Sequence, residues 1–233
     1  MIAVAAIQSV GAGAAASVLD APGRLPAAIE IAGALTLLSI LPAILVSVTC
    51  FTRIVIVLSF VRRALALQEL PPNQVVVGLA LFLTLFVMWP VAVQVHTTSV
   101  APYLEGKTSV KEAGVSAAEI LQTFLLKHTR PADLALFTEA ARIEAPPSPQ
   151  ALPIRVVIPA FLLSELKTAF QMGFVVFLPF LVIDLVVSAV LLAMGMFMLP
   201  PTMISTPLKV LLFVLVDGWN LVVRSLLTSV AAP

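Results

Sequence analysis

The chain has 233 residues, of which 61% are hydrophobic and 11% are charged, and its net charge at pH 7 is +1. Soluble domains are typically about 45–50% apolar and about 25% charged, so one water-soluble core cannot bury this excess, and the composition predicts a membrane protein. The balanced charge gives no electrostatic basis for binding nucleic acid. A single cysteine, Cys50, excludes an intrachain disulfide and a multi-cysteine metal site.

Residues 1–33 are predicted to form an N-terminal segment with a possible signal peptide. Residues 1–19 are small and apolar, and Ala14-Ala15-Ala16-Ser17 is similar to a signal-peptidase site. No Lys or Arg precedes this apolar stretch, although signal peptides normally begin with a basic region. The sequence leaves a cleaved signal peptide and a frayed N-terminal tail as alternatives.

Residues 34–95 are predicted to form a first apolar helical hairpin. Its first membrane segment, 34–61, is bent early by Pro42, and its second, 75–95, contains no formally charged residue. About 20 apolar residues suffice to cross the hydrocarbon core. Arg62 and Arg63 lie in the short loop between the segments, which favours a cytoplasmic loop. The domain that follows the hairpin is then expected in the periplasm.

Residues 96–153 carry charges of both signs and are predicted to form a small helical domain in water. Ser116-x-x-Glu119 matches a capping box at the start of an amphipathic helix. Pro131 suits the first turn of a second helix. The expected apolar faces of the two helices consist of Ile120, Leu121, Phe124 and Leu125, and of Leu134, Leu136 and Phe137. Three prolines, Pro146, Pro147 and Pro149, are expected to form a stiff connector.

Residues 154–233 are predicted to form a second, kinked apolar hairpin. The segment 156–199 is too long for one simple span, so Pro159 and Pro179 are expected to divide or kink it. The last segment covers residues 203–230. The predicted fold class is an all-α, membrane-associated protein built from kinked helical hairpins and a small helical extracytoplasmic domain.

The turn of this hairpin, residues 194–201, alternates three methionines with a glycine and a phenylalanine before two prolines. Methionine is unbranched and polarizable, so clustered methionines form a soft surface that can repack around varied shapes. Such a turn is better suited to closing a passage than to binding one fixed molecule. A role in filling the core is equally consistent with the residues alone.

Six ionisable residues lie within the apolar segments, where each is costly and is therefore a candidate functional residue: Arg53, Glu165, Lys167, Asp184, Lys209 and Asp217. Structural ion pairs between helices, or positions near a membrane surface, are the favoured interpretation. If the hairpin turns near Phe197, Asp184 and Lys209 lie at similar depth, and a contact between them is predicted. Glu165 and Lys167 are two residues apart, so their partners are expected on other segments or subunits.

The sequence contains no nucleotide-binding loop, no His-Glu-x-x-His, no Gly-x-Ser-x-Gly and no Cys-x-x-Cys. No feature fixes the separation of Glu165 and Asp184, so they are not a recognisable catalytic pair. The sequence predicts a protein that is not an enzyme and requires no cofactor.

Six segments in order resemble one family: Phe51–Val57 (FTRIVIV), Pro71–Thr84 (PPNQVVVGLALFLT), Arg130–Phe137 (RPADLALF), Ser164–Phe174 (SELKTAFQMGF), Leu178–Leu185 (LPFLVIDL) and Phe213–Trp219 (FVLVDGW). The chain thereby resembles the FliP family, the P subunit of the flagellar type III export gate, over about residues 35–228. The R subunits of virulence secretion systems are homologous to this family. The apolar N-terminus and the size of residues 96–153 favour the flagellar branch.

The resemblance implies a channel that passes unfolded export substrates. Copies of the chain would assemble with the Q and R subunits, other basal-body and export-apparatus proteins, and lipid. The location implied is the bacterial inner membrane at the flagellar basal body, with part of the chain in the periplasm. Met194, Met196, Phe197 and Met198 would form a gasket in the closed channel, and the stranded charges would bridge subunits.

Family members also tend to lie partly above the bilayer plane despite their hydropathy. A secondary transporter or ion channel that uses intramembrane carboxylates remains the alternative. A transporter is expected to show inverted repeats, and none is evident in the sequence.

Overall fold

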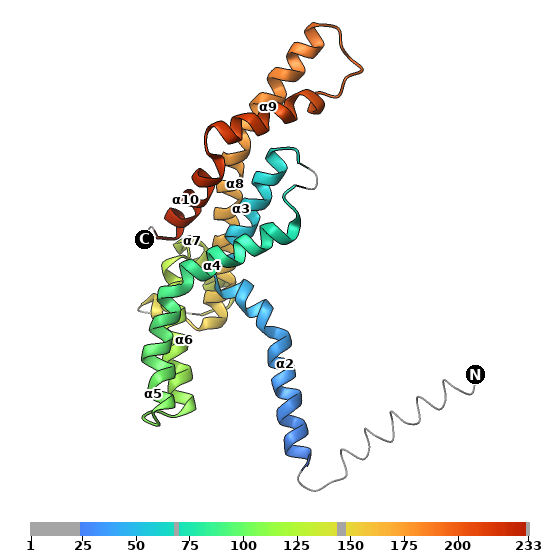
Figure 1. Cartoon of the computed structure of the whole chain (residues 1–233). Helices are drawn as coiled ribbons and strands as arrows, with labels where there is room; N and C mark the ends of the chain where they lie inside the picture. The colour runs from blue at the N-terminus through green and yellow to red at the C-terminus, as the bar shows by residue number, and fades with distance from the viewer. Residues whose placement is uncertain (1–23, 68–69, 144–147, 232–233) are drawn as a thin grey trace, which may run out of the picture. The chain divides into compact units, whose positions relative to one another are not determined.

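The computed structural model describes residues 24–67, 70–143 and 148–231, and it divides into two units, residues 1–45 and 46–233 (Figure 1). All regular elements within the described ranges are helices, which confirms the predicted all-α class. The predicted signal peptide and its cleavage site lie outside the described residues.

The first unit contains most of α2, Arg24–Val48, which has Pro42 in its interior. The parts before and after this position, Ile31–Ile40 and Pro42–Val48, are bent by 42°. The predicted segment 34–61 is not one helix, because α2 ends at Val48 and α3, Phe51–Ala64, begins after Cys50.

The second unit begins with a hairpin of α3 and α4, Asn73–Val95. The helix continues beyond the predicted end of the second segment, through a π-helical turn, His96–Val100, into α5, Ala101–Leu104. A long apolar helix follows later in the chain: α8, Ile154–Ala193, has 40 residues and is continuous through Pro159 and Pro179. Of the two predicted effects of its prolines, a division or a kink, the division is therefore wrong.

At 1.5 Å per residue α8 is about 60 Å long, roughly twice the thickness of a hydrocarbon core. Among the described residues, two helical stretches, Asn73–Leu104 and Ile154–Ala193, are long and apolar enough to span a membrane, or up to four if each bent helix pair is counted as one span. The second bent pair replaces the predicted last segment. It consists of α9, Thr202–Leu215, and α10, Gly218–Ala231, which meet at 64°.

The corner between α9 and α10 depends on two adjacent residues. Asp217 has a φ of 50°, in the left-handed region that Asp tolerates better than most residues. Gly218 is buried against Phe213, and a Cβ on this glycine would lie 2.2 Å from the ring. The sequence Asp217-Gly218 therefore permits a sharp change of direction where the prediction had one continuous segment.

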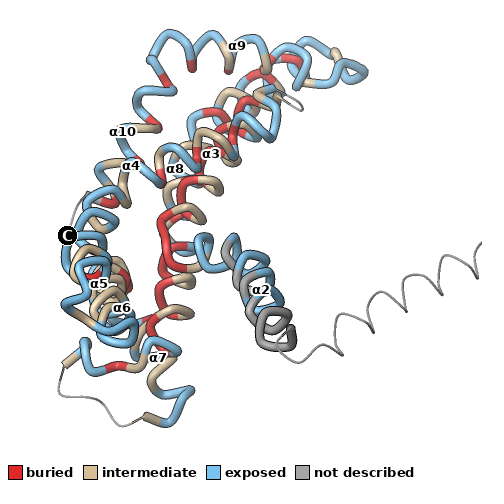
Figure 2. Tube along the Cα trace, turned by 60° about the horizontal axis from the view of Figure 1, so that its bottom comes forward, coloured by how far each residue is buried: buried red, intermediate tan, exposed pale blue. Residues whose placement is uncertain are grey.

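The main core lies where α3 packs on α8. Buried residues of α3 recur at helical spacing, so that one face meets α8 while α4 and α10 cover its sides; they are Ile54, Val57, Leu58 and Val61. Cys50 is buried in this core. Figure 2 shows the buried residues following α8 and α3 side by side.

A second core joins the start of α8 to two shorter helices, α6, Val110–Lys127, and α7, Pro131–Ala140. The expected position of Pro131 at the start of α7 is confirmed. The capping-box prediction is wrong in position. Ser109 and Glu112 form the box at the start of α6, while Ser116 and Glu119 lie inside the helix.

The predicted apolar faces of α6 and α7 are largely confirmed. Leu125 is buried in the second core, and Leu121, Phe124, Leu134 and Phe137 pack against it. Leu136 is exposed instead. Of the expected proline connector, Pro146 and Pro147 lie outside the described residues, and Pro149 begins a short 3-10 helix, Pro149–Ala151.

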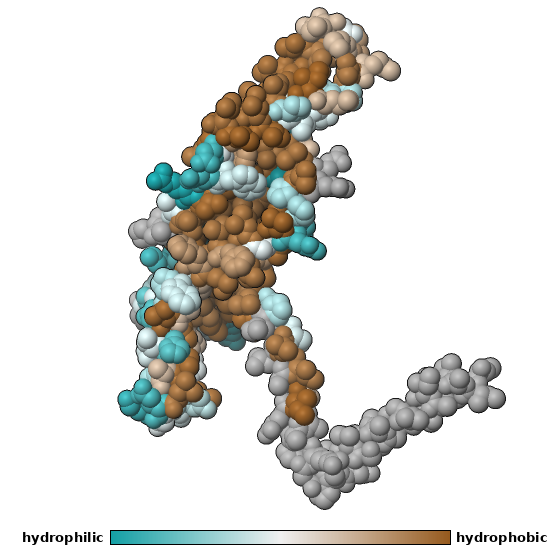
Figure 3. Space-filling view, in the orientation of Figure 1, coloured by the Kyte–Doolittle hydropathy of each residue, from teal (hydrophilic) through white to brown (hydrophobic). Residues whose placement is uncertain are grey.

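The surface that these cores leave uncovered is largely apolar over α8 and α9 (Figure 3). Hydrophilic groups gather instead at the end where α5 meets α6. Contiguous exposed apolar surface of this kind is suited to lipid or to other protein chains.

The close approach of α3 and α8 predicts an effect at Gly173. A Cβ at this position would lie 2.5–2.6 Å from the ring of Phe60, near the root of that side chain. Gly173→Ala is expected to destabilise the protein by about 1–3 kcal/mol, because the tightly packed helices must separate. Thermal unfolding in detergent measures the effect.

Gly114→Ala is the matched control, since nothing lies within 4 Å of its added Cβ in α6. This change is expected to stabilise the helix by about 0.5–1 kcal/mol. Equal effects of the two substitutions would contradict the assigned packing.

Candidate functional site

The Met turn, residues 194–201, begins with a Schellman motif at the end of α8. Gly195 has a φ of 75°, the Gly195 N–H donates to the Leu192 carbonyl, and the Met196 N–H donates to the Leu191 carbonyl, both at 3.0 Å. This pair of bonds satisfies carbonyl groups that a helix end leaves open. The glycine among the methionines thus ends the helix and reverses the chain.

The four predicted gasket residues do not share one environment. Met194, Phe197 and Met198 are exposed, and the Met198 side chain is 97% exposed. Met196 is half-buried, and its backbone takes part in the helix cap. The tip of the turn therefore presents two thioethers and one aromatic ring, while Met196 belongs partly to its base.

The predicted contact between Asp184 and Lys209 is present. Lys209 Nζ lies 2.5 Å from Asp184 Oδ2, and the Ser205 hydroxyl donates to Asp184 Oδ1 at 2.6 Å. The Lys209 side chain is 3% exposed and that of Asp184 is 37% exposed. Ser205 was not predicted, although it precedes Lys209 by one helical turn and so shares its face.

A second ion pair joins Arg53 of α3 to Glu165 of α8 in the main core. Arg53 uses its Nε and one terminal nitrogen for the two oxygens of Glu165, with an Nε–Oε2 distance of 2.9 Å. Its other terminal nitrogen donates to the Ser229 carbonyl at 2.9 Å and contacts the Ser229 hydroxyl at 3.2 Å. Both side chains are almost completely buried. One guanidinium therefore connects α3, α8 and α10.

The third contact engages Lys167, which faces α7. Its ammonium pairs with the buried carboxylate of Asp133, whose other oxygen accepts a hydrogen bond from Ser164 Oγ at 2.7 Å. The Ser164 hydroxyl in turn accepts from the Arg130 backbone N–H at 3.0 Å. As predicted, Glu165 and Lys167 have partners on different helices. Asp133 was not among the predicted site residues.

The pKa of Asp133 is lowered from its ordinary value. Burial opposes ionisation, but hydrogen bonds from Lys167 and Ser164, together with the positive charges of Lys167 and Arg130, more than offset it. The position of Asp133 in the first turn of α7 also favours a negative charge. The ionised carboxylate therefore holds α7 against α8.

Asp217, the last of the predicted charged residues, lies at the α9–α10 corner with an exposed side chain. No ion pair to it is present among residues 24–67, 70–143 and 148–231. Within those ranges no group of three or more His, Cys, Asp or Glu residues could hold a metal ion.

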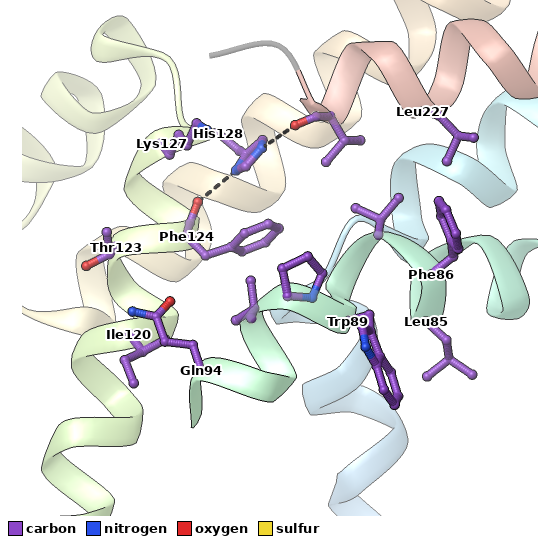
Figure 4. A pocket seen from close by; sticks show the side chains of 14 residues that line it. Leu85, Phe86, Trp89, Gln94, Ile120, Thr123, Phe124, Lys127, His128 and Leu227 are labelled. Carbon is purple, nitrogen blue, oxygen red and sulfur yellow. Dashed lines mark hydrogen bonds between the residues drawn. The ribbon is translucent and has the colours of Figure 1, made fainter. Parts of the chain in front are cut away.

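A further contact that was not predicted involves His128 at the end of α6 (Figure 4). Its Nδ1 lies 2.8 Å from the Phe124 carbonyl oxygen and its Nε2 lies 3.0 Å from that of Val230 in α10. A neutral imidazole carries one N–H, so it can donate to only one of these oxygens, whereas an imidazolium donates to both. His128 and Arg53 thus both hold the last turn of α10.

Phe124, His128 and Val230 border a cavity of about 900 Å³ between α4, α6 and α10. Its walls are mostly apolar, with Phe86, Trp89 and Leu227 on one side and Ile120 on the other (Figure 4). The polar groups at its edge include Gln94 and Lys127.

A family model described as the FliP family matches residues 34–226. The flagellar biosynthetic protein FliP of Bacillus subtilis (strain 168) is 53% identical over 208 residues, covering 89% of this chain and 94% of that protein. The protein of the same name from Pectobacterium carotovorum subsp. carotovorum is 54% identical over 195 residues, covering 84% and 76%. That of Aquifex aeolicus (strain VF5) is 44% identical over 209 residues, covering 89% and 87%. The matched range contains the Met turn and the ion pairs Arg53–Glu165, Lys167–Asp133 and Lys209–Asp184.

The unequal exposure of Asp184 and Lys209 predicts unequal effects of removing them. Asp184→Ala leaves a buried ammonium without its partner, and such a loss costs about 3–5 kcal/mol. Lys209→Met leaves a partly solvated carboxylate and is expected to cost less, about 1–2 kcal/mol. Chemical denaturation in detergent measures both changes.

Exchanging the two residues, Asp184→Lys with Lys209→Asp, is expected to restore part of the stability lost by either single charge reversal. A double variant no more stable than the single variants would contradict a direct interaction.

The lowered pKa of Asp133 predicts a stability loss in acid. Its ionised form contributes stability above the unfolded-state pKa of about 3.9, and this contribution disappears as the pH falls through the lower folded-state value. Asp133→Asn is expected to be less stable than the wild type near neutral pH and to lose less stability between about pH 5 and pH 3. Thermal unfolding across this range measures the difference.

Glu139→Gln is the control for this prediction, because Glu139 is an exposed carboxylate on the same helix. It is expected to follow the wild-type pH profile. A profile of Asp133→Asn parallel to that of the wild type would contradict the proposed linkage.

Proposed function

The chain belongs to the FliP family, and we propose that it is a pore-forming subunit of the bacterial flagellar type III protein export gate. Its relatives carry the name flagellar biosynthetic protein, which favours the flagellar system over virulence secretion. Its task is then to pass unfolded export substrates without a chemical reaction.

The exposed Met turn is the observation that carries this proposal. Met194, Phe197 and Met198 are large apolar side chains at the tip of a hairpin, with little of the subunit covering them. Copies arranged around a shared axis would bury these side chains against one another. Thioethers have low rotational barriers and polarizable sulfur, so they can seal an empty channel and reshape around different passing chains.

The base of the turn supports the same role because it is rigid. The Schellman motif fixes the end of α8, and the Asp184–Lys209 pair with Ser205 joins α8 to α9 below the turn. A gasket needs this combination, since a soft tip must be held at a constant radius while substrates pass.

Assembly with further copies, the Q and R subunits and other export-apparatus proteins is supported by the apolar surface of α8 and α9 (Figure 3). We place the complex in the inner membrane at the flagellar basal body, with residues 96–153 in the periplasm. The length of α8, about 60 Å, requires part of an upright helix to lie outside the hydrocarbon core.

The alternative function, a secondary transporter or ion channel, depends on carboxylates that bind a coupled ion. Glu165 and Asp184 are each engaged by a cationic side chain of the same subunit. Asp217 is exposed at a helix corner rather than enclosed with other ligands. These contacts favour structural ion pairs over an ion-coupling site.

The gasket role predicts a leak when the methionines are truncated together. The triple variant Met194→Ala, Met196→Ala and Met198→Ala is expected to increase the ion conductance of the assembled complex in planar bilayers about tenfold or more, because smaller side chains leave the closed pore open. Native mass spectrometry checks that assembly is intact.

Leu104→Ala is the control, since Leu104 is an exposed apolar residue at the end of α5, outside the hairpin of the Met turn. It is expected to leave conductance unchanged. A fully assembled triple variant with wild-type conductance would reject the gasket function.

A further inference from the structure

A cavity of about 740 Å³ separates the end of α3 from the start of α9. Its polar lining consists of the guanidinium groups of Arg62 and Arg63 and the hydroxyl groups of Thr202 and Thr206. Two positively charged residues of the first hairpin therefore line the same cavity as α9, the helix that follows the Met turn.

The two arginines carry charge that no described carboxylate of the chain compensates. Within the described ranges no ion pair connects either of them to a carboxylate. Within the same ranges the side-chain contact of Arg62 is long, 3.5 Å from its Nη1 to the Pro71 carbonyl oxygen. Asp184, on the neighbouring α8, already pairs with Lys209. Arg62 and Arg63 both line the cavity, so an anion bound in it would be attracted by both positive charges.

We propose that this cavity binds the phosphate group of an anionic phospholipid. Guanidinium groups recognise phosphate oxygens through paired N–H donors. Thr202 adds a further polar group, whereas the Thr206 hydroxyl already donates to the Thr202 carbonyl oxygen at 2.7 Å. Leu67, Met203 and Pro207 supply apolar lining to the same cavity. Further along α9, Leu208 and Leu211 border a separate apolar cavity against α8, which offers a surface for an acyl chain.

The expected topology places the cavity at the membrane surface where such lipids occur. A short loop with two arginines between apolar segments favours the cytoplasmic side. Anionic phospholipids give that leaflet a negative surface potential that attracts basic groups. A free phosphate ion would satisfy the arginines but would leave the apolar side of the cavity uncovered.

A bound lipid would connect two parts of the subunit that the cavity separates. Its phosphate would be held by α3, and its acyl chain would lie along α9, which begins directly after the Met turn. Anionic lipid would thereby restrain the turn from its C-terminal side, whereas Asp184 and Lys209 restrain α8 and α9 through protein contacts alone.

The test uses the full chain in a neutral detergent. Short-chain phosphatidylglycerol, short-chain phosphatidylcholine and inorganic phosphate are titrated separately, and binding is followed by calorimetry. The wild type is expected to prefer phosphatidylglycerol over both other ligands. Arg62→Gln with Arg63→Gln is expected to weaken phosphatidylglycerol binding about 25-fold, at about fivefold for each arginine.

Arg155→Gln is the matched control, because Arg155 is an exposed arginine at the start of α8, away from the cavity lining. It is expected to retain wild-type binding. If the double variant fails to fold, Arg63→Gln alone decides the test, since the Arg63 side chain has no hydrogen bond or ion pair among the described residues. Unchanged phosphatidylglycerol affinity in the arginine variants would overturn the site. Equal affinity of the wild type for inorganic phosphate and phosphatidylglycerol would overturn its assignment to lipid.

Discussion

The arrangement of the second unit depends on one buried ion pair. The Glu165 side chain is shielded from solvent almost completely, and a charge in that position is tolerated only with full compensation. Arg53 supplies it by donating to both carboxylate oxygens. The geometry leaves one guanidinium nitrogen free, and this nitrogen binds the last turn of α10 through Ser229. A pair of this kind adds little net stability compared with apolar residues, but it permits few alternative positions of the three helices.

Other polar groups around this ion pair are also paired with partners of complementary charge or hydrogen-bonding character. His128 reaches the next carbonyl of α10, at Val230. Asp133 is neutralised by Lys167, which follows Glu165 by two residues and therefore lies on a different face of α8. Helix ends expose unpaired backbone groups that need such partners. Outside these polar contacts the helices are held by apolar packing, and much apolar surface remains exposed, which suits contact with lipid or other protein chains. Polar contacts thus fix the helices of the second unit relative to one another, while the exposed surface is left largely apolar.

Features that depend on local periodicity, or on equal distance from a hairpin turn, could be predicted from the sequence. The apolar segments, the start of α7 and the Asp184–Lys209 contact follow from periodicity and from the position of the hairpin turn. It could not find the partner of Glu165, because Arg53 is 112 residues away and no local pattern encodes such a pairing. Two Ser-x-x-Glu patterns, at Ser109 and Ser116, both match a capping box, and only the chain reversal before α6 selects the first.

The prolines of α8 led to a second incorrect expectation, that the helix could be divided at Pro159 and Pro179. Proline removes one backbone donor, at a cost of about 3 kcal/mol in an isolated helix interior, and this cost predicts a break. In an apolar helix supported by neighbours the remaining hydrogen bonds and packing outweigh it, so α8 passes through Pro159 and Pro179. The sequence singled out Asp217 for its charge, but nothing in it predicted that the backbone at Asp217 and Gly218 would divide the last apolar segment.

The uninterrupted length of α8 has a mechanical meaning. Glu165 and Asp184 are 19 residues apart on this helix, which corresponds to about 28 Å along its axis. Each forms an ion pair with a different neighbouring helix, Glu165 with α3 and Asp184 with α9. Because α8 has no break between these points, a tilt about the Glu165 contact would carry Asp184, α9 and Met194 with it. In the proposed gate, where several copies would surround one pore, a small tilt in the core would move each Met turn by a larger distance without bending the helix.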